Sequence, residues 1–171
     1  MPFITNFLIR VRGGEPLPAG VSLPLERNER VLTWGRVHGG GIAAATDVGL
    51  RVRRGDDSTP TLHPWHEIAR AVWREGQLVV EDMDRTMTSY RLAEPRGVPA
   101  AVREHVNATV VVSERHAIGT AGVRIVARRN LRTGALLWST VFDDPSVDAE
   151  GELQDQADAL LTAVRRRFSE S

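Results

Sequence analysis

The run His38-Gly39-Gly40-Gly41 has the residue types and spacing that most suggest catalysis. Consecutive glycines leave backbone N–H groups accessible, and such groups can form an oxyanion hole that stabilises a tetrahedral intermediate in acyl transfer. That reaction also needs a nucleophilic serine on a Gly-x-Ser-x-Gly turn, which the sequence lacks; its nearest match is Gly20-Val21-Ser22-Leu23-Pro24. We therefore predict no catalytic residues and interpret residues 38–41 as a flexible hairpin tip.

The segment His63-Pro64-Trp65-His66-Glu67 contains three candidate metal ligands. Histidines three residues apart would lie on one side of a helix, but the proline between them disfavours a helix. No further ligand is close in sequence, so the rest of a metal site would have to come from a distant part of the chain. We interpret these histidines as structural or surface residues and predict neither a metal site nor another cofactor.

Two groups of arginines could bind an anion, such as the phosphate of a lipid, a nucleotide or a nucleic acid. They comprise Arg51, Arg53 and Arg54 in the first group, and Arg128, Arg129 and Arg132 in the second. The aromatic content of 5% leaves few rings for base stacking, so we expect no nucleic-acid binding. The alternative interpretation is that these arginines are solvated on an exposed sheet face.

The composition excludes several other kinds of chemistry. The 171 residues contain no cysteine and no lysine, which excludes disulfides, thiolate metal sites, a Schiff-base lysine and the lysine of a Walker A loop. The 22 basic residues are therefore all arginines, and they balance 22 acidic residues to give a formal net charge of zero. Any electrostatic binding site must then be local.

Residues 1–24 predict an N-terminal amphipathic segment and an extended connector. Apolar residues at helical spacing over residues 2–12 predict a short helix that docks on the protein's own core or on a partner, with peripheral membrane contact as the alternative. Arg10 and Arg12 stand where a signal peptide would be apolar or small. Because no apolar run approaches the roughly 18 residues of a membrane span, we expect a soluble cytoplasmic protein.

Residues 25–106 predict a meander of short antiparallel strands that ends in a helix over Val98–Val106, with Asn107 as its C-cap. The expected strands are 31–37, 42–46, 50–53, 65–74, 77–81 and 87–92. Helix and strand remain open for residues 65–74; we favour the strand because Glu75-Gly76 can form a tight turn into the next one. In residues 50–53, arginines alternate with apolar residues, which predicts one solvated face.

Residues 107–171 predict a β-β-β-α unit. Strands are expected at 109–118, 123–128 and 135–142, the first of them buried on both faces because it contains three consecutive valines. A single apolar stripe predicts a long C-terminal helix from about Asp148 to Phe168. The expected fold class is therefore α+β: an antiparallel partial barrel with a short helix, followed by this unit.

Two resemblances rest on these segments. The succession ERVLTWGRV, GIAAATDVGLRV, WHEIARAVW and GQLVV, followed by the helix, resembles the bacterial pleckstrin-homology-like domains over roughly residues 25–106. The whole chain is similar to a family of small uncharacterised actinobacterial proteins, through residues 25–34, 65–73, 91–116 and 123–144. The first resemblance implies a pleckstrin-like barrel that binds lipids, peptides or partner proteins. The second implies an architecture and no site residues.

These observations predict a non-enzymatic binding or assembly protein, with a second copy of the chain or another protein as its partner. The alternative is a small-ligand or anionic-lipid-binding module that uses an arginine-lined face. An enzyme is the third option, and it would require acids or histidines that are distant in sequence to converge in one cleft.

Overall fold

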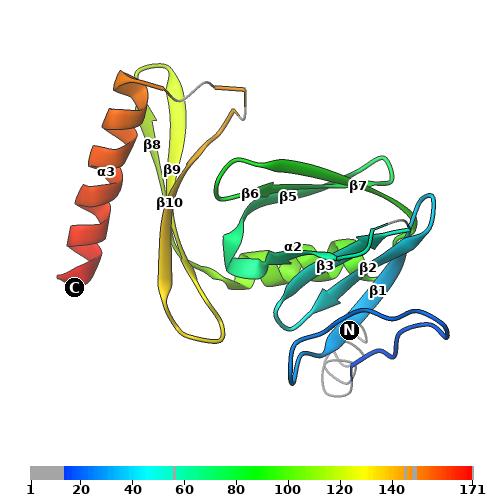
Figure 1. Cartoon of the computed structure of the whole chain (residues 1–171). Coiled ribbons are helices and arrows are strands. Elements are labelled where there is room, and N and C mark those ends of the chain that lie inside the picture. Colours follow the sequence, from blue (N-terminus) through cyan, green and yellow to red (C-terminus); the bar gives the residue numbers. More distant parts are fainter. Residues whose placement is uncertain (1–13, 56, 145, 148–149, 171) are drawn as a thin grey trace, which may run out of the picture. The chain divides into compact units, whose positions relative to one another are not determined.

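The computed structural model describes residues 14–55, 57–144, 146–147 and 150–170. The chain divides into two compact units, Met1–Ala108 and Thr109–Ser171 (Figure 1). Both units combine antiparallel strands with an α-helix, so the predicted α+β class is confirmed. The helix predicted over residues 2–12 lies outside the described residues. Neither α-helix of the described chain has the length and hydropathy that crossing a lipid bilayer requires.

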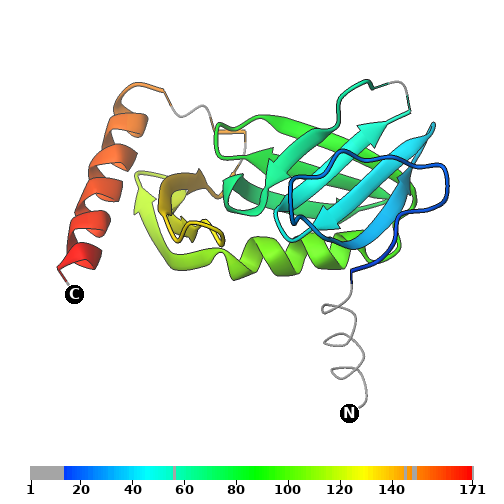
Figure 2. The same cartoon turned by 60° about the horizontal axis from the view of Figure 1, so that its bottom comes forward.

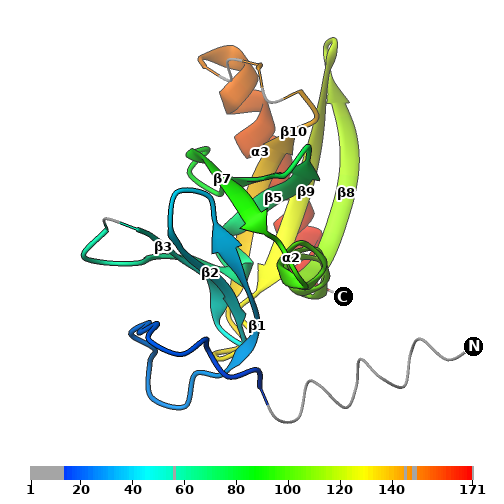
Figure 3. The ribbon, with the colours of Figure 1, turned by 90° about the vertical axis from the view of Figure 1, so that its right-hand side faces the viewer.

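The first unit is built on a seven-stranded antiparallel sheet in the order β4-β3-β2-β1-β7-β6-β5. Its strands are β1 (Val31–Val37), β2 (Gly41–Thr46), β3 (Gly49–Arg54), β4 (Thr61–Pro64), β5 (Ile68–Arg74), β6 (Gln77–Asp82) and β7 (Met87–Glu94). The pairing of β1 with β7 joins two meanders, β1–β4 and β5–β7, which lie at an angle to one another (Figure 3). The sheet is not closed, because β4 and β5 are its two edges.

The prediction that residues 65–74 form a strand is right for β5 and wrong for the first three residues. Trp65–Glu67 form one turn of 3₁₀-helix, η1, between β4 and β5. The indole of this turn is buried and donates its N–H to the Thr46 carbonyl at 2.9 Å, which anchors the turn against β2. Strand β4 was not predicted, because residues 61–64 show no apolar alternation.

Helix α2 (Val98–Ala108) packs against the sheet of the same unit (Figure 2). Its buried face consists of Val98, Ala101, Val102 and Val106, and the predicted helix is confirmed. The helix extends past Asn107, so the prediction of a C-cap at that residue is wrong; the capping signal of one asparagine does not outweigh the helical preference of Ala108 after it. The same core contains Trp65, Leu78, Val80 and Tyr90.

The extended connector covers the second face of the β1–β3 strands. Leu23 is buried against Val31, Ile42 and Ala44, and Trp34 donates its indole N–H to the Pro16 carbonyl at 2.9 Å. The alternate residues of β2, at 43 and 45, face the main core. Both faces of β2 are therefore buried, which explains why its side chains are so small.

The second unit is a three-stranded antiparallel sheet with one long helix. Its elements are β8 (Val110–Ile118), β9 (Ala121–Arg129), β10 (Leu136–Phe142) and α3 (Glu152–Ser169), with the strand order β10-β9-β8. Ala157 and Val164 are the buried residues of the α3 stripe, whereas Phe168 is 42% exposed and contacts the Trp138 ring edge-on. The helix begins later than predicted because Gly151, with a φ of 56°, is its N-cap.

Strand β8 is not buried on both faces as predicted. Its exposure alternates along its whole length, and Val111 in the middle of the valine run is 37% exposed. Helix α3 packs against the face of the sheet to which Val123 of β9 points. His116 of β8 is the register partner of Val123 and therefore points to the same face. Residues of β8 that point away from this face remain accessible, so the valine run reflects β-propensity and not double burial.

Candidate functional site

Arg51 does not lie on a solvated face. Its guanidinium forms a two-point ion pair with Glu29, in which Nε donates to Oε1 and Nη2 donates to Oε2, each at 2.7 Å. The Arg51 side chain is 9% exposed and that of Glu29 is fully buried. The expectation of a solvated face is therefore wrong at this residue, because residues 25–30, which precede β1, place the Glu29 carboxylate over it.

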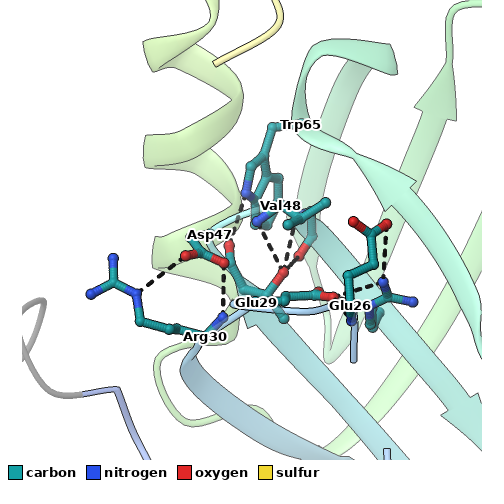
Figure 4. Close-up of polar contacts among 9 residues, drawn as sticks. Glu26, Glu29, Arg30, Asp47, Val48 and Trp65 are labelled. Carbon is teal, nitrogen blue, oxygen red and sulfur yellow. Dashed lines mark hydrogen bonds and ion pairs between the residues drawn. The ribbon is translucent and has the colours of Figure 1, made fainter. Parts of the chain in front are cut away.

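Further hydrogen bonds keep Glu29 ionised. The backbone N–H of Glu26 donates to Glu29 Oε2 at 2.8 Å (Figure 4). Burial alone raises the pKa of Glu29, but the hydrogen bonds from Arg51, Glu26 and Thr46 outweigh it, so the pKa lies below its ordinary value of 4.5. At neutral pH the carboxylate is charged and occupies the Arg51 guanidinium, which leaves this arginine unavailable to a ligand.

The β2–β3 turn beside this pair is closed by its own side chains. Thr46 Oγ1 accepts the N–H groups of Val48 and Gly49, each at 3.1 Å. Arg30 donates to Asp47 from its backbone N–H at 2.9 Å and from its Nε at 3.2 Å (Figure 4). The bonds from Arg30 tie the residue before β1 to the β2–β3 turn, so we assign this cluster a structural role.

The second predicted group, in the other unit, is not one exposed patch. Arg128 is buried and donates from Nη1 to Thr109 Oγ1 at 2.9 Å. Burial lowers the pKa of Arg128 to about 10, which still leaves it charged at neutral pH. Arg129 and Arg132 are exposed. Because adjacent strand residues point to opposite faces, Arg128 and Arg129 do not present one binding surface.

Arg53 and Arg54 also point to opposite faces of their strand, and they differ in surroundings. Arg53 is half-buried on the connector side, whereas Arg54 is exposed at the end of β3. The Arg54 guanidinium lies 5.3 Å from the centroid of the Tyr90 ring, and its Nη2 donates to the Ser89 carbonyl at 3.3 Å. The cation–π contact and the hydrogen bond give Arg54 a defined position.

A hollow of about 350 Å³ opens beside Arg54, and we refer to it as the glycine-turn hollow. Three segments line it: the β1–β2 turn, the end of β3 with the loop after it, and β7. Its polar residues are His38, Arg54, Asp57, Ser89, Tyr90 and Arg91. Of the arginines predicted from the sequence, only Arg54 lines this hollow. Arg91 was missed because it stands alone in its strand, and no sequence signal pairs it with Arg54.

Donors prevail over acceptors in the glycine-turn hollow. Within the described chain, neither Arg54 nor Arg91 forms an ion pair with a carboxylate. The Gly39 N–H likewise meets no acceptor in that part of the chain, whereas the His38 N–H donates to the Arg91 carbonyl at 2.8 Å. Asp57 supplies one negative charge against the two arginines. Such a donor set fits an anion.

Three hydrogen-bonded side chains lie next to the hollow: His63 and Tyr90, which are buried, and Asp82, which is partly exposed. His63 Nδ1 is 3.0 Å from both oxygens of Asp82, and His63 Nε2 is 2.7 Å from the Tyr90 hydroxyl. Burial raises the pKa of Tyr90, and the nearby Arg54 charge offsets this only in part. Sequence reasoning missed this group because its members are 19 and 27 residues apart.

The remaining sequence motifs form no site of their own. Residues 38–40 connect β1 to β2, so the predicted hairpin tip is confirmed there, whereas Gly41 already belongs to β2. His66 Nε2 lies 3.7 Å from Glu67 Oε1, and His63 bonds to Asp82. Among the residues that the structure describes, no three histidine or acidic side chains are grouped so that they could hold a metal ion.

Comparison with known proteins gave no family model that matches the chain, and no significantly similar curated protein or solved structure. The resemblances to pleckstrin-homology-like domains and to an actinobacterial family therefore stay predictions from the sequence. The case for a function rests on the geometry of the glycine-turn hollow.

Proposed function

We propose that this chain is a non-enzymatic binding protein that holds a small anionic group, of the phosphate type, in the glycine-turn hollow. The observation that carries the proposal is that two arginines, Arg54 and Arg91, line one hollow and that neither guanidinium group forms an ion pair with a carboxylate of the described chain. Guanidinium groups form short, charge-assisted hydrogen bonds with phosphate oxygens. The adjacent glycine turn adds a backbone donor at Gly39.

Two features of the hollow set the expected strength of binding. Arg54 is already held by Tyr90 and Ser89, so little side-chain freedom is lost when an anion binds. Asp57 opposes an anion and keeps the net charge of the hollow small. We therefore expect weak, salt-dependent affinity for a free phosphate, and stronger binding where a ligand adds further contacts.

The resemblance to pleckstrin-homology-like domains supports a binding role of this kind, since such domains bind lipids, peptides or partner proteins. A phosphate group can come from a phospholipid head group or from a free phosphate ester, and the chemistry of the hollow is the same for both. The two sources are separated by presenting the anion in solution or on vesicles.

The test compares the protein with Arg54→Ala and Arg91→Ala, using Arg103→Ala as the matched control, because Arg103 is exposed on α2 and does not line the hollow. Inorganic phosphate should raise the melting temperature of the wild type and the control in a saturable way. Each hollow variant should bind roughly tenfold more weakly, the cost of about one charged hydrogen bond. Binding to phosphatidylcholine vesicles only when they contain an anionic phospholipid would identify a lipid source.

No stabilisation of the wild type by phosphate or anionic vesicles would contradict the proposal. An equal loss of binding in Arg103→Ala would also contradict it, because the effect would then come from overall charge and not from the hollow.

A second candidate function, assembly with a protein partner, is favoured by the edge strand β5. Val72 is 44% exposed and Trp73 is 39% exposed there, and an edge strand can pair with another chain. Light scattering over a range of concentrations should then show a mass above that of one chain, reduced by Trp73→Arg. A strict monomer at all concentrations would count against self-assembly.

A further inference from the structure

The hydrogen-bonded side chains Asp82, His63 and Tyr90 connect the two meanders of the first unit. His63 comes from β4, at one edge of the sheet, whereas Asp82 and Tyr90 come from β6 and β7. His63 and Tyr90 are each 3% exposed. Hydrogen bonds between buried groups are strong and directional, so the bond between His63 and the Tyr90 hydroxyl fixes the orientation of the Tyr90 ring.

The direction of the hydrogen bonds follows from the chemistry of the three groups. An ionised carboxylate can only accept, so His63 Nδ1 carries a proton and donates it to Asp82. Nε2 and the Tyr90 hydroxyl, 2.7 Å apart, form the second hydrogen bond of the imidazole. The Tyr90 hydroxyl is therefore engaged inside the core, and the part of Tyr90 that serves the hollow is the face of its ring.

That ring face is the surface on which the Arg54 guanidinium rests, 5.3 Å from the centroid. We infer that the Asp82-His63-Tyr90 chain positions Arg54 in the glycine-turn hollow, so that Asp82 and His63 control the affinity of the hollow without lining it. The part of this inference that concerns affinity rests on the proposed function. The part that concerns the position of Arg54 stands by itself.

Three variants separate positioning from general stability. Asp82→Ala removes the acceptor of His63 Nδ1, whereas Asp82→Asn keeps an oxygen acceptor there and should restore most of the wild-type behaviour. Tyr90→Phe keeps the ring and removes the hydroxyl that bonds to His63. Asp84→Ala is the matched control, because Asp84 lies in the same β6–β7 turn and bonds to Thr86 instead.

The first measurement needs no ligand: the NMR signals of the Arg54 side chain, which the Tyr90 ring should shift upfield. We expect this shift to decrease in Asp82→Ala and Tyr90→Phe, and to persist in Asp82→Asn and Asp84→Ala, with circular dichroism unchanged. Phosphate affinity should fall about threefold to tenfold in the same two variants.

An Arg54 shift that stays at its wild-type value in both Asp82→Ala and Tyr90→Phe would overturn the inference. If the shift decreases as expected but wild-type protein binds no phosphate, positioning is supported and the proposed function fails. The two claims can therefore be judged separately.

Discussion

Arg51 and Arg54 are close neighbours in one strand, yet their surroundings give them different chemistry. The Arg51 guanidinium forms a two-point ion pair with the buried carboxylate of Glu29. The Arg54 guanidinium lies over the Tyr90 ring and lines the glycine-turn hollow. A buried ion pair contributes little net stability when complete, but removing one partner leaves an uncompensated charge. The same residue type is therefore a structural anchor at one position and a candidate ligand contact at the other.

Glu29→Gln should destabilise the protein by about 3 kcal/mol at pH 7, because it leaves the Arg51 charge buried without its counter-ion. Urea unfolding measures this cost. Glu26→Gln is the control: its carboxylate is 45% exposed and 3.7 Å from Arg51, so less than about 1 kcal/mol is expected. An equal effect of the two substitutions would contradict the assigned role of Glu29.

The pH dependence of this pair has a defined sign. The folded-state pKa of Glu29 is below its ordinary value of 4.5, so the pair stabilises the fold above that pH and loses its contribution as the pH falls through the folded-state value. The stability difference between wild type and Glu29→Gln should therefore shrink below pH 4.5. A difference that stays constant down to acid unfolding would contradict the lowered pKa.

The sequence predicted that arginines could form an anion-binding site, but it could not show which arginines are bound to the protein's own carboxylates and which are not. Alternation in residues 50–53 placed Arg51 on a face that would be solvated in a bare hairpin, and nothing in residues 25–30 indicated that Glu29 would cover it. The bonds of His63 to Asp82 and Tyr90 also depend on how the sheet folds back on itself. Contacts over such separations are not encoded in local periodicity.

At the scale of elements, the β1–β2 turn depends on glycine for two different reasons. Gly39, Gly40 and Gly41 all have positive φ, at 82°, 99° and 102°. A Cβ at Gly39 would meet no atom within 4 Å, whereas one at Gly41 would lie 2.1 Å from the Arg53 carbonyl oxygen. The first glycine therefore serves backbone conformation alone, and the last also permits close approach of β3.

Gly39→Ala should cost about 1–2 kcal/mol of stability, the strain of a left-handed conformation. Gly41→Ala should cost clearly more, because the backbone of β3 has to move as well. Unfolding midpoints in urea compare the two variants directly. Equal costs would show that the close approach to Arg53 does not constrain the turn.

Elements with regular alternation were predictable from the sequence, and irregular ones were not. The strands β1, β3 and β7 and the helices α2 and α3 carry a clear period of two or 3.6 residues, and all five are present. Strand β4 and the turn η1 lack such a period, because their positions are set by the burial of the Trp65 side chain. The valine run of β8 led to a wrong prediction of burial on both faces, because the strand has one accessible face.

For the whole molecule, the formal net charge of zero means that no general field attracts an anion. Binding must come from the two arginines and the glycine turn of the hollow, all of which belong to the first unit. The sequence located the end of β3 as a place for such a site. It could not supply Arg91 or the Tyr90 support, because both come from β7, far along the chain.

The most direct test is a titration of the isotope-labelled full chain with inorganic phosphate, followed by ¹H–¹⁵N NMR, with sodium chloride of equal ionic strength as the control. We predict saturable shifts of the Gly39 and Gly40 amide signals and of the Arg54 Nε–H signal, and none of these in Arg54→Ala. Saturable shifts confined to other parts of the chain, or the absence of any saturable shift, would contradict an anion site in the glycine-turn hollow.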